Sequence, residues 1–498
     1  MAVALYYGDA LPTKPDPSVG TVLVTGASGY VGGRLVPELL HRGYRVRILV
    51  RSKAESYAKR WGDVEVVEGD ARRPEVAGRA LEGIHAAYYL IHALATGPAK
   101  LQQIETKVAH TFRVAAAKAG VANIIYLGDL GDSGKALSRH LASRLQVANE
   151  LRAGPVPVTE LRAAVIVGSG SASYEIISGL VMRVPLTQSS RFLTTLCQPI
   201  AIRDVIRYLI GVMETPTALG RRLDIGGPDI LSYRSMIRRF AKIVHKKVRF
   251  FEFPWASPRI YSYIIGVLTP VPPTIARSLI EGLRDEAVCR NNDILEIINI
   301  SPIRFDEAVM WAQRAVETDD VMTRWSGARP RDILQVVHFD ELPRGPRYQD
   351  HYQKITDCAA KAVFQTITRV GGDSGWFNSN FLWAIRGAID RLLFGVGLSR
   401  GRRSRGKLLV GDVIDFWRVE ELVQERRLLL RAEMKVPGLA WLEFGVYPFD
   451  DGTRSVLSIT AYFEPVGFWG HVYWWFFKPF HRFIFNDMLN EIARKSGA

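Results

Sequence analysis

The sequence predicts an α/β protein, in which a doubly wound parallel sheet is followed by a second α+β domain built on an antiparallel sheet. Short apolar runs alternate with helical stretches from Thr21 onward, and a glycine-rich turn joins the first run to the first helix. After residue 347 the pattern changes to longer alternating runs with a hairpin signal. Because parallel strands need crossover connections, the first pattern indicates a parallel sheet with helices on both faces.

The first domain is expected to cover residues 20–325. Its regular alternation fades after the sixth strand into a substrate lobe, and a helical stretch from Ile303 to Val316 closes it. Strands are expected at 21–27, 45–51, 64–70, 86–94, 123–129 and near 158–167, with helices at 32–43 and 104–120 among the connections.

Three further segments complete the predicted organisation. Residues 1–19 contain Pro and Gly but no signal-length apolar run, which indicates a flexible leader. Residues 326–347 are rich in Pro, Gly and Arg and are typical of a linker. Residues 348–498 form the C-terminal domain, where Asp450 to Gly452 supply a hairpin turn and an aromatic helix ends the chain.

Composition narrows the class of protein. A chain of 498 residues with 48% hydrophobic and 23% charged residues suits two folded domains. The cysteines Cys197, Cys289 and Cys358 fit neither a disulfide framework nor a zinc site, and the histidines lack metal-ligand spacing, so we expect a cytoplasmic protein without a metal. The net charge of +15 favours anionic partners. Because no nucleic-acid-binding motif accompanies this charge, we expect no nucleic-acid partner.

The stretch "TGASGYVGGRL" predicts a dinucleotide-binding (Rossmann) loop. Small residues are needed there because the turn is tight, the backbone must approach a pyrophosphate, and the helix must pack on the strand. The free N–H groups at the helix start then stabilise the phosphate charge. The predicted cofactor-binding residues of this loop are Gly26, Ser28, Gly29, Tyr30 and Gly32.

The end of the second strand favours NADP over NAD. An acidic residue that would accept bonds from the NAD ribose is absent, and Arg51 stands there instead, with Lys53 close by. A cation at this point can pair with the 2′-phosphate of NADP. Asp70, at the end of the third strand, is a candidate for the adenine amino group, with a helix cap as the alternative.

The chain resembles the short-chain dehydrogenase/reductase superfamily, specifically its atypical NAD(P)H-binding branch that includes regulators similar to the nitrogen metabolite repressor. The resemblance covers roughly residues 20 to 320 and rests on "TGASGYVG", "EGDARRP", "NIIYLGDLG", "RAAVIVGSGSAS", "QPIAIRDV" and "LDIGGPDILSYRSM". The tail looks like an uncharacterised domain that is often fused behind this branch and is similar to the START-like fold.

The resemblance also implies a catalytic Ser and a Tyr-x-x-x-Lys pair, from which this sequence departs. Gly128 and Asp129 stand where the Ser is expected, and His140 and Arg144 stand for the Tyr and the Lys. Arg144 is a suitable ribose anchor because a guanidinium donates well and remains charged. His140 is a weaker proton donor, since a histidine is largely neutral at pH 7 and a cation one turn away disfavours its protonation.

Two functions remain open. The first is an NADP-dependent oxidoreductase with altered catalytic residues, with Tyr174 as a substitute proton donor if it enters the cleft rather than packing. The second is a non-catalytic protein that senses NADP(H) or binds it structurally and passes its state to the C-terminal domain. The missing Ser and Tyr favour slightly a site that binds the nucleotide and barely turns over.

The aromatic helix from Gly467 to Phe485 suggests two roles. Lys478, Pro479 and Arg482 interrupt it, so it does not read as a membrane-spanning segment, and packing across a curved sheet explains it best. The alternative is peripheral membrane contact through this helix and the Arg-rich loop 399–407. A sheet wrapped around a helix also leaves room for a small hydrophobic ligand.

Overall fold

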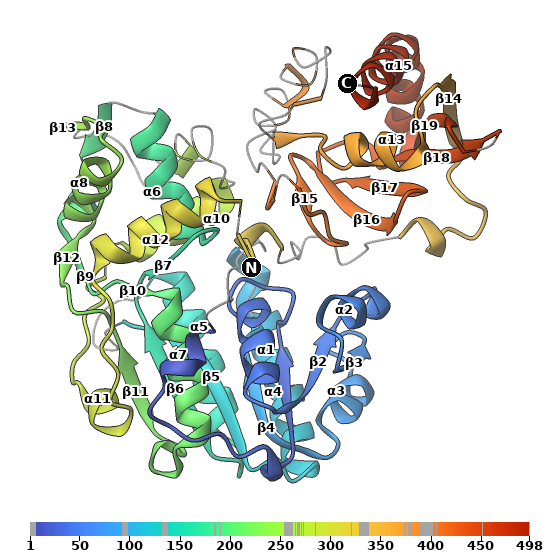
Figure 1. Ribbon diagram of the computed structural model, residues 1–498. Coiled ribbons are helices and arrows are strands. Elements are labelled where there is room, and N and C mark those ends of the chain that lie inside the picture. Colours follow the sequence, from blue (N-terminus) through green and yellow to red (C-terminus); the bar gives the residue numbers. More distant parts are fainter. Residues whose placement is uncertain are drawn as a thin grey trace. The chain divides into compact units, whose positions relative to one another are not determined.

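The chain divides into two compact units (Figure 1). The computed structural model describes residues 6–91, 98–131, 138–183, 186–189, 191–252, 285–319, 321–327, 338–372, 406–450 and 452–497, with shorter pieces within 262–283, 375–390 and 402–404. The first unit comprises Met1–Thr269 and Pro273–Asp332, and the second comprises Ile333–Ala498 with Pro270–Pro272.

The first unit is built on a seven-stranded sheet whose strand pairs all run parallel, which confirms the predicted fold class. The strand order is β11-β6-β5-β4-β1-β2-β3, so the direction of winding reverses between β1 and β4. Dinucleotides bind at such a reversal, beyond the carboxyl ends of the strands. The strands are β1 (Thr21–Thr25), β2 (Arg45–Val50), β3 (Val64–Glu68), β4 (Ile84–Tyr89), β5 (Asn123–Asp129), β6 (Val158–Ala163) and β11 (Arg222–Ile225).

Helices cover both faces of this sheet, because successive side chains of a strand point to opposite sides. Val22 and Val24 of β1 pack in one apolar cluster with residues of α1 and α7. Leu23 packs in another cluster with residues of α3, α4 and α5. The helices are α1 (Gly32–His41), α2 (Ala54–Trp61), α3 (Pro74–Leu81), α4 (Pro98–Lys118), α5 (Arg139–Arg152) and α7 (Ile202–Glu214).

The lobe that follows the sixth strand consists of short strand pairs and helices. Two-stranded sheets pair β7 with β10, β9 with β12 and β8 with β13. The helix predicted near residues 303–316 is α12 (Phe305–Glu317). The other elements are η1 (Tyr7–Ala10), η2 (Pro17–Val19), β7 (Ile166–Val167), α6 (Ala172–Arg183), β8 (Leu186–Ser189), η3 (Arg191–Thr194), β9 (Leu196–Cys197), β10 (Ile200–Ala201), η4 (Pro216–Ala218), β12 (Leu231–Ser232), α8 (Tyr233–Ile243), β13 (Arg249–Glu252), α10 (Pro273–Gly282), α11 (Asp293–Ile297) and η5 (Trp325–Gly327).

The part of the expected flexible leader that the structure describes, residues 6–19, packs against the first unit, which corrects the expectation for this segment. Tyr7 and Gly8 donate their backbone N–H groups to the Glu38 carboxylate of α1, each at 2.9 Å. Arg42 donates to both carboxylate oxygens of Glu214 at 2.7 Å and to the Gly8 carbonyl at 2.8 Å. The composition of the segment did not reveal these contacts, because the partner side chains lie on helices that are distant in the sequence.

The second unit is built on a six-stranded antiparallel sheet in the order β14-β19-β18-β17-β16-β15. The hairpin predicted at residues 450–452 is confirmed, since Phe449 pairs with Arg454 across the β18–β19 turn. Asp450 and Gly452 take positive φ values of 55° and 89° there. The elements are η6 (Phe339–Glu341), β14 (Tyr348–Thr356), α13 (Ala360–Ile367), β15 (Val413–Ile414), β16 (Trp417–Val423), β17 (Arg427–Ala432), β18 (Gly438–Phe449), β19 (Arg454–Pro465) and α15 (Gly467–Ser496).

One face of this sheet forms an apolar core with α13 and the second half of α15. Leu428, Leu442 and Ile459, from three neighbouring strands, are buried on this face of the sheet. They belong to the same apolar cluster as Phe485 and Ile492 of α15. In the part of the chain that is described, no helix has the length and apolar character needed to cross a membrane.

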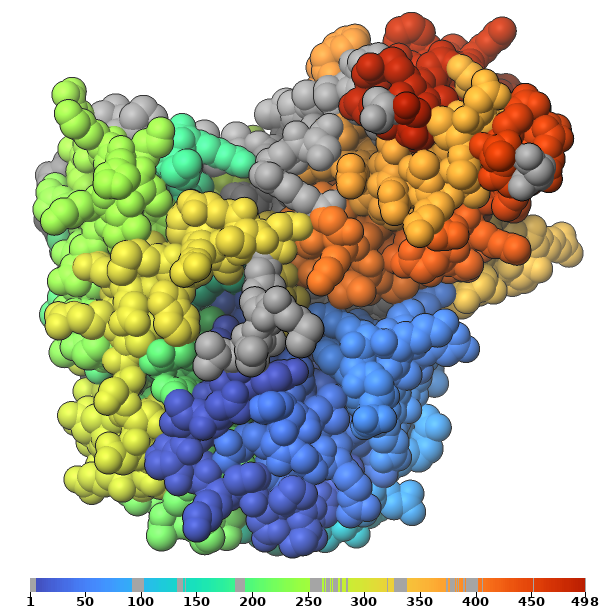
Figure 2. Space-filling view, viewed as in Figure 1, coloured from blue at the N-terminus to red at the C-terminus, as the bar shows by residue number. Residues whose placement is uncertain are grey.

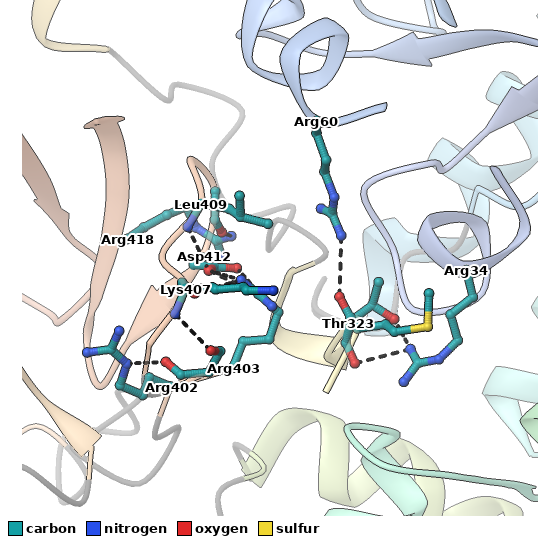
Figure 3. Close-up of polar contacts among 12 residues, drawn as sticks. Arg34, Arg60, Thr323, Arg402, Arg403, Lys407, Leu409, Asp412 and Arg418 are labelled. Atoms are coloured by element: carbon teal, nitrogen blue, oxygen red, sulfur yellow. Dashed lines mark hydrogen bonds and ion pairs between the residues drawn. The ribbon is translucent and has the colours of Figure 1, made fainter. Parts of the chain in front are cut away.

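The Arg-rich loop 399–407 is tied to its own unit at its two described arginines (Figure 3). Arg402 is buried and donates to the carbonyl oxygens of Val370 and Thr368 at 2.9 and 2.7 Å. Arg403 pairs with Asp412, with Nε 2.9 Å from Oδ1. Both guanidinium groups thus bond within the sheet domain. Arg400 and Arg405 of the same loop lie outside the described residues, so membrane contact through the loop stays a prediction.

We expect Arg42→Ala to lower the free energy of unfolding of the first unit by about 3–5 kcal/mol, because Glu214 would remain buried without its counter-ion. Urea denaturation followed by circular dichroism measures this loss. Arg45→Ala, which removes an exposed arginine from the start of β2, is the control and should cost about 0.5 kcal/mol or less. Equal losses in the two variants would contradict the structural role of the leader contacts.

We expect limited proteolysis to cut between Gly327 and Arg347, because the contacts of the chain divide after Asp332. The products should be two fragments that match the expected domains 20–325 and 348–498. Mass spectrometry of the fragments locates the cut. Early cleavage within β16 to β19, with the segment 326–347 left intact, would show that the expected boundary is misplaced.

Candidate nucleotide-binding site

The glycine loop between β1 and α1 brings backbone atoms closer together than a side chain would allow. A Cβ atom on Gly26, whose φ is +69°, would lie 2.5 Å from the Leu90 carbonyl oxygen at the end of β4. A Cβ on Gly32 would lie 2.4 Å from the Gly26 carbonyl oxygen. The Gly29 N–H closes the turn on the same oxygen at 2.9 Å. The loop therefore packs tightly at the reversal between β1 and β4, where dinucleotides bind in folds of this kind.

The start of α1 has the features of an anion site. The residue that precedes the helix, Val31, provides no side-chain cap for its first N–H groups. These groups and the partial positive charge of the helix end favour a phosphate. Ser28 lies in the same loop and is partly exposed.

The Tyr30 side chain contributes to packing rather than to the phosphate loop. The Arg34 guanidinium lies over its ring, 4.2 Å from the centroid. A Cβ on Gly168 would lie 2.6 Å from the Tyr30 hydroxyl, so this hydroxyl sits close against the chain after β7. Burial raises the pKa of Tyr30 to about 12. Any contact of Tyr30 with a nucleotide phosphate would therefore come from its backbone.

A segment that the sequence analysis did not connect to the loop, residues 321–327, returns to the start of α1 (Figure 3). Arg34 donates to the carbonyl oxygens of Thr323 and Ser169 at 3.1 and 2.8 Å. A Cβ on Gly33 would lie 2.7 Å from Cγ2 of Thr323, so the glycine permits this close contact. Arg60 of α2 donates to the neighbouring Met322 carbonyl oxygen at 3.3 Å.

The ends of β2 and β3 present positive charge. Arg51 is exposed directly after β2, and it lies close enough to Asp70 and Arg72 to interact with both. Asp70 accepts hydrogen bonds from the Arg72 N–H at 2.9 Å and from Arg72 Nε at 2.8 Å. Burial raises the pKa of Asp70, but the bonds from Arg72 outweigh it and hold the pKa below its usual value. Asp70 is thus a charged partner of Arg72, and the residue at the cap of α3 is Arg73 instead.

Asp129, His140 and Arg144 meet at the end of β5 and the start of α5. The Nε2 atom of His140 lies 3.2 Å from Oδ2 of Asp129, and Nε of Arg144 lies 3.6 Å from the same oxygen. The helix begins at Arg139, where Ser138 accepts a hydrogen bond from the Leu141 N–H at 3.3 Å. His140 and Arg144 therefore share a face as their spacing predicts. The sequence analysis missed the part played by Asp129, although its place at a strand end was the available signal.

Arg144 is deeply buried at this site. It donates to the Leu127 carbonyl oxygen, and its guanidinium lies over the Tyr126 ring at 4.8 Å. Burial disfavours the charged form, but Tyr126, Asp129 and Glu105 favour it more, so the pKa of Arg144 lies above its usual value. Among the described residues, its Nη1 atom has no hydrogen-bond acceptor. A charged donor thus lies beside His140.

The small cavity at this place is lined by Asp129 and Arg144 and has a volume of about 40 Å³. It is large enough for water. The segments 92–97 and 132–137, which follow β4 and β5 in the chain, lie outside the described residues.

Tyr174, which the sequence left open as a substitute proton donor or a packing residue, packs between helices. Its hydroxyl donates to Oε1 of Gln313 at 3.0 Å, and its ring packs edge-to-face on Phe240 at 5.5 Å. The side chain is buried. Tyr174 joins α6 to α8 and α12.

His338, Asp340 and Glu420 form the one cluster with metal-ligand character among the described residues, with ligand atoms within 4.8 Å of one another. Glu420 already accepts the Phe339 N–H at 2.6 Å and pairs with Arg431 at 3.2 Å. The positive charge of Arg431 against this carboxylate would repel a metal ion. We therefore interpret the cluster as an ion-pair network that joins η6 to the sheet.

Comparisons with known proteins agree with this arrangement. The NmrA-like family matches residues 18–284, and a protein family of unknown function, DUF2867, matches residues 342–488. A ceramide reductase from Caulobacter vibrioides is 28% identical over 243 residues, which are 47% of this chain and 74% of the relative. The photosystem II assembly factor Ycf39 from Trieres chinensis is 21% identical over 247 residues, 49% of this chain and 76% of that protein.

Among solved structures, the triphenylmethane reductase of Citrobacter sp. complexed with NADP(H) has a TM-score of 0.48 and 19% identity, covering 59% of this chain and 99% of that one. The match to the NmrA-like family spans more than half of the chain and contains the glycine loop, Asp129, His140 and Arg144. The second unit corresponds to DUF2867, and its START-like character stays a prediction. The chain belongs to the NmrA-like family.

Proposed function

We propose that this protein is an NADP(H)-dependent oxidoreductase in which His140 replaces the usual tyrosine as proton donor. The observation that carries the proposal is the contact between Nε2 of His140 and Oδ2 of Asp129 at 3.2 Å. A carboxylate on one imidazole nitrogen orients the ring, and its negative charge offsets that of Arg144, whose Nε lies 3.6 Å from the same oxygen. The sequence did not predict this contact between His140 and Asp129, and without it a nearly inactive site was favoured.

The glycine loop supports nucleotide binding, because the close backbone contacts at Gly26 and Gly32 form a tight turn between β1 and α1, at the place where a pyrophosphate binds in such folds. Ser28, Gly29 and the Tyr30 backbone would complete the loop. Arg51 would pair with the 2′-phosphate, and Asp70 would hold Arg72 beside it. We therefore expect NADP(H) to bind more tightly than NAD(H).

When bound, the cofactor would supply a hydride to the carbonyl carbon of a ketone, aldehyde or quinone. His140 would give the proton to the substrate oxygen, which leaves an alcohol or hydroquinone and a neutral imidazole that solvent reprotonates. Asp129 would hold the ring in place, and Arg144 would anchor the ribose. The reductase relative from Caulobacter vibrioides supports a reduction.

A second candidate is a non-catalytic NADP(H)-sensing protein. The observation that favours it is the burial of Arg144, whose guanidinium bonds to the Leu127 carbonyl and covers the Tyr126 ring. If Arg144 serves only the fold, then the ribose lacks its usual anchor and hydride transfer is poorly aligned. The assembly-factor relatives support a role of this kind.

For the second unit we propose a START-like domain that binds a small hydrophobic ligand. A long helix packed against an antiparallel sheet supports the fold, and a cradle of this kind is where such a ligand would bind. We also propose a cytoplasmic location with peripheral membrane contact, which the exposed aromatic residues of α15 support. Mass spectrometry of lipids extracted from the purified protein tests the ligand.

We expect the protein to bind NADPH more tightly than NADH, and we expect Arg51→Ala to weaken NADPH binding about 10-fold or more while NADH binding is unchanged. The reason is the loss of a charge-assisted contact with the 2′-phosphate. Titration of nucleotide fluorescence measures both affinities. Arg45→Ala, at the opposite end of β2, is the control. Equal affinities for the two nucleotides in the unaltered protein would refute the preference.

We expect His140→Ala to reduce turnover about 100-fold or more with little change in NADPH affinity, because the proton donor is lost and the phosphate loop is intact. The rate of the unaltered protein should fall as pH rises, since only the imidazolium donates a proton. Asp129→Asn should slow the reaction, because the imidazole loses the carboxylate that orients it. NADPH oxidation with a panel of aldehydes, ketones and quinones measures these effects.

The control for the histidine is His110→Ala on α4, whose side chain is 58% exposed and pairs with Glu150. It should leave turnover unchanged. If no substrate in the panel is reduced while NADPH still binds, the sensing function takes the place of the oxidoreductase. The substitution of His140→Tyr with Arg144→Lys should move the pH range of activity upward.

A further inference from the structure

Helix α15 is aromatic on two faces, only one of which the second unit covers. On the covered face, the Trp474 ring stacks on Tyr348 of β14 at 5.4 Å and on Phe463 of β19 at 5.9 Å. Phe485 and Met488 continue this face into the apolar core. Core packing therefore accounts for only part of the aromatic density of the helix.

The opposite face exposes a run of large apolar side chains, which we name the aromatic stripe. Its members recur at intervals of three or four residues, so they lie on one side of the helix. Over about 22 Å of helix, calculated from 1.5 Å per residue, this face stays apolar. The stripe consists of Phe468 (73% exposed), Trp469 (71%), Val472 (40%), Trp475 (59%), Phe476 (64%), Phe480 (47%) and Phe483 (66%). The helix lies at the surface of its unit (Figure 2).

A contiguous apolar surface of this kind marks an interaction site. The charges beside it are all basic, since the sequence contains no acidic residue from Val466 to Asn486. Lys478 lies over the Trp475 ring at 4.9 Å, and Arg482 is exposed one turn further on. Both cations can reach past the rings while their stems lie on apolar surface.

Tryptophan and phenylalanine flanked by lysine and arginine match the boundary between lipid headgroups and acyl chains. The rings would enter the boundary, and the two cations would pair with lipid phosphates. Arg402 and Arg403 are excluded from this surface, because their guanidinium groups bond within the second unit. In the part of the chain that the structure describes, the basic charge beside the stripe thus comes from Lys478 and Arg482 of the helix itself.

We propose that the aromatic stripe of α15 docks the protein on membranes that contain anionic phospholipid, with the helix lying in the plane of the surface. This inference deepens the membrane contact of the proposed function and rests on it. Anionic lipid is favoured because the stripe combines apolar area with the positive charge of Lys478 and Arg482.

Vesicle flotation of the full chain tests this proposal. We expect binding to vesicles of phosphatidylcholine with phosphatidylserine. Binding to vesicles of phosphatidylcholine alone should be weaker by about 10-fold or more. Trp475→Ala with Phe476→Ala should reduce binding to both kinds of vesicle about 10-fold or more. Lys478→Glu with Arg482→Glu should remove the preference for the anionic lipid, and added salt should weaken it in the unaltered protein.

Tyr447→Ala is the matched control, because Tyr447 is 50% exposed on β18 of the same unit and lies outside the stripe. Circular dichroism and NADPH titration of every variant separate a folding defect from a lipid effect. Normal NADPH affinity without lipid binding would overturn the membrane inference alone, whereas lipid binding without NADPH affinity would overturn the nucleotide function alone. A dimer that the stripe variant dissociates, with no vesicle binding, would assign the stripe to a second copy of the chain.

Discussion

The close approach of backbone to backbone at the glycine loop is the constraint on which the candidate site depends. Gly26 lies against the Leu90 carbonyl, and Gly32 lies against Gly26, at separations that a Cβ would violate. The contact brings the ends of β1 and β4 and the start of α1 to one point, where the strand order also reverses. Because Gly33 permits the same closeness to Thr323, the segment 321–327 is fixed to this point as well.

The second organising interaction is electrostatic. His140 and Arg144 lie one turn apart on α5, where two groups able to carry positive charge would repel each other. Asp129 lies within ion-pair distance of both, so one carboxylate offsets the repulsion and keeps the side chains together. The three side chains are therefore electrostatically coupled, since Asp129 contacts both of the others.

The second unit shows how an apolar helix can serve two surroundings. Trp474 and Phe485 of α15 bury their rings against β14 and β19, whereas Trp469 and Phe483 point to solvent. A helix with apolar residues all around it reads from its sequence as a buried one. Burial in this unit is one-sided because a single sheet face covers the helix, and the uncovered face is what gives the helix an interfacial character.

The sequence by itself determined the order of strands and helices, the parallel sheet, the hairpin before β19 and the glycine loop, because each follows from local periodicity or from backbone space at named glycines. It also placed His140 and Arg144 on one face of a helix. Only the tertiary structure decided that Asp129 joins them, that Glu38 and Glu214 hold residues 6–19, and that Arg402 turns inward. These contacts join residues far apart in the chain, and no local pattern specifies which distant partner a charged side chain meets.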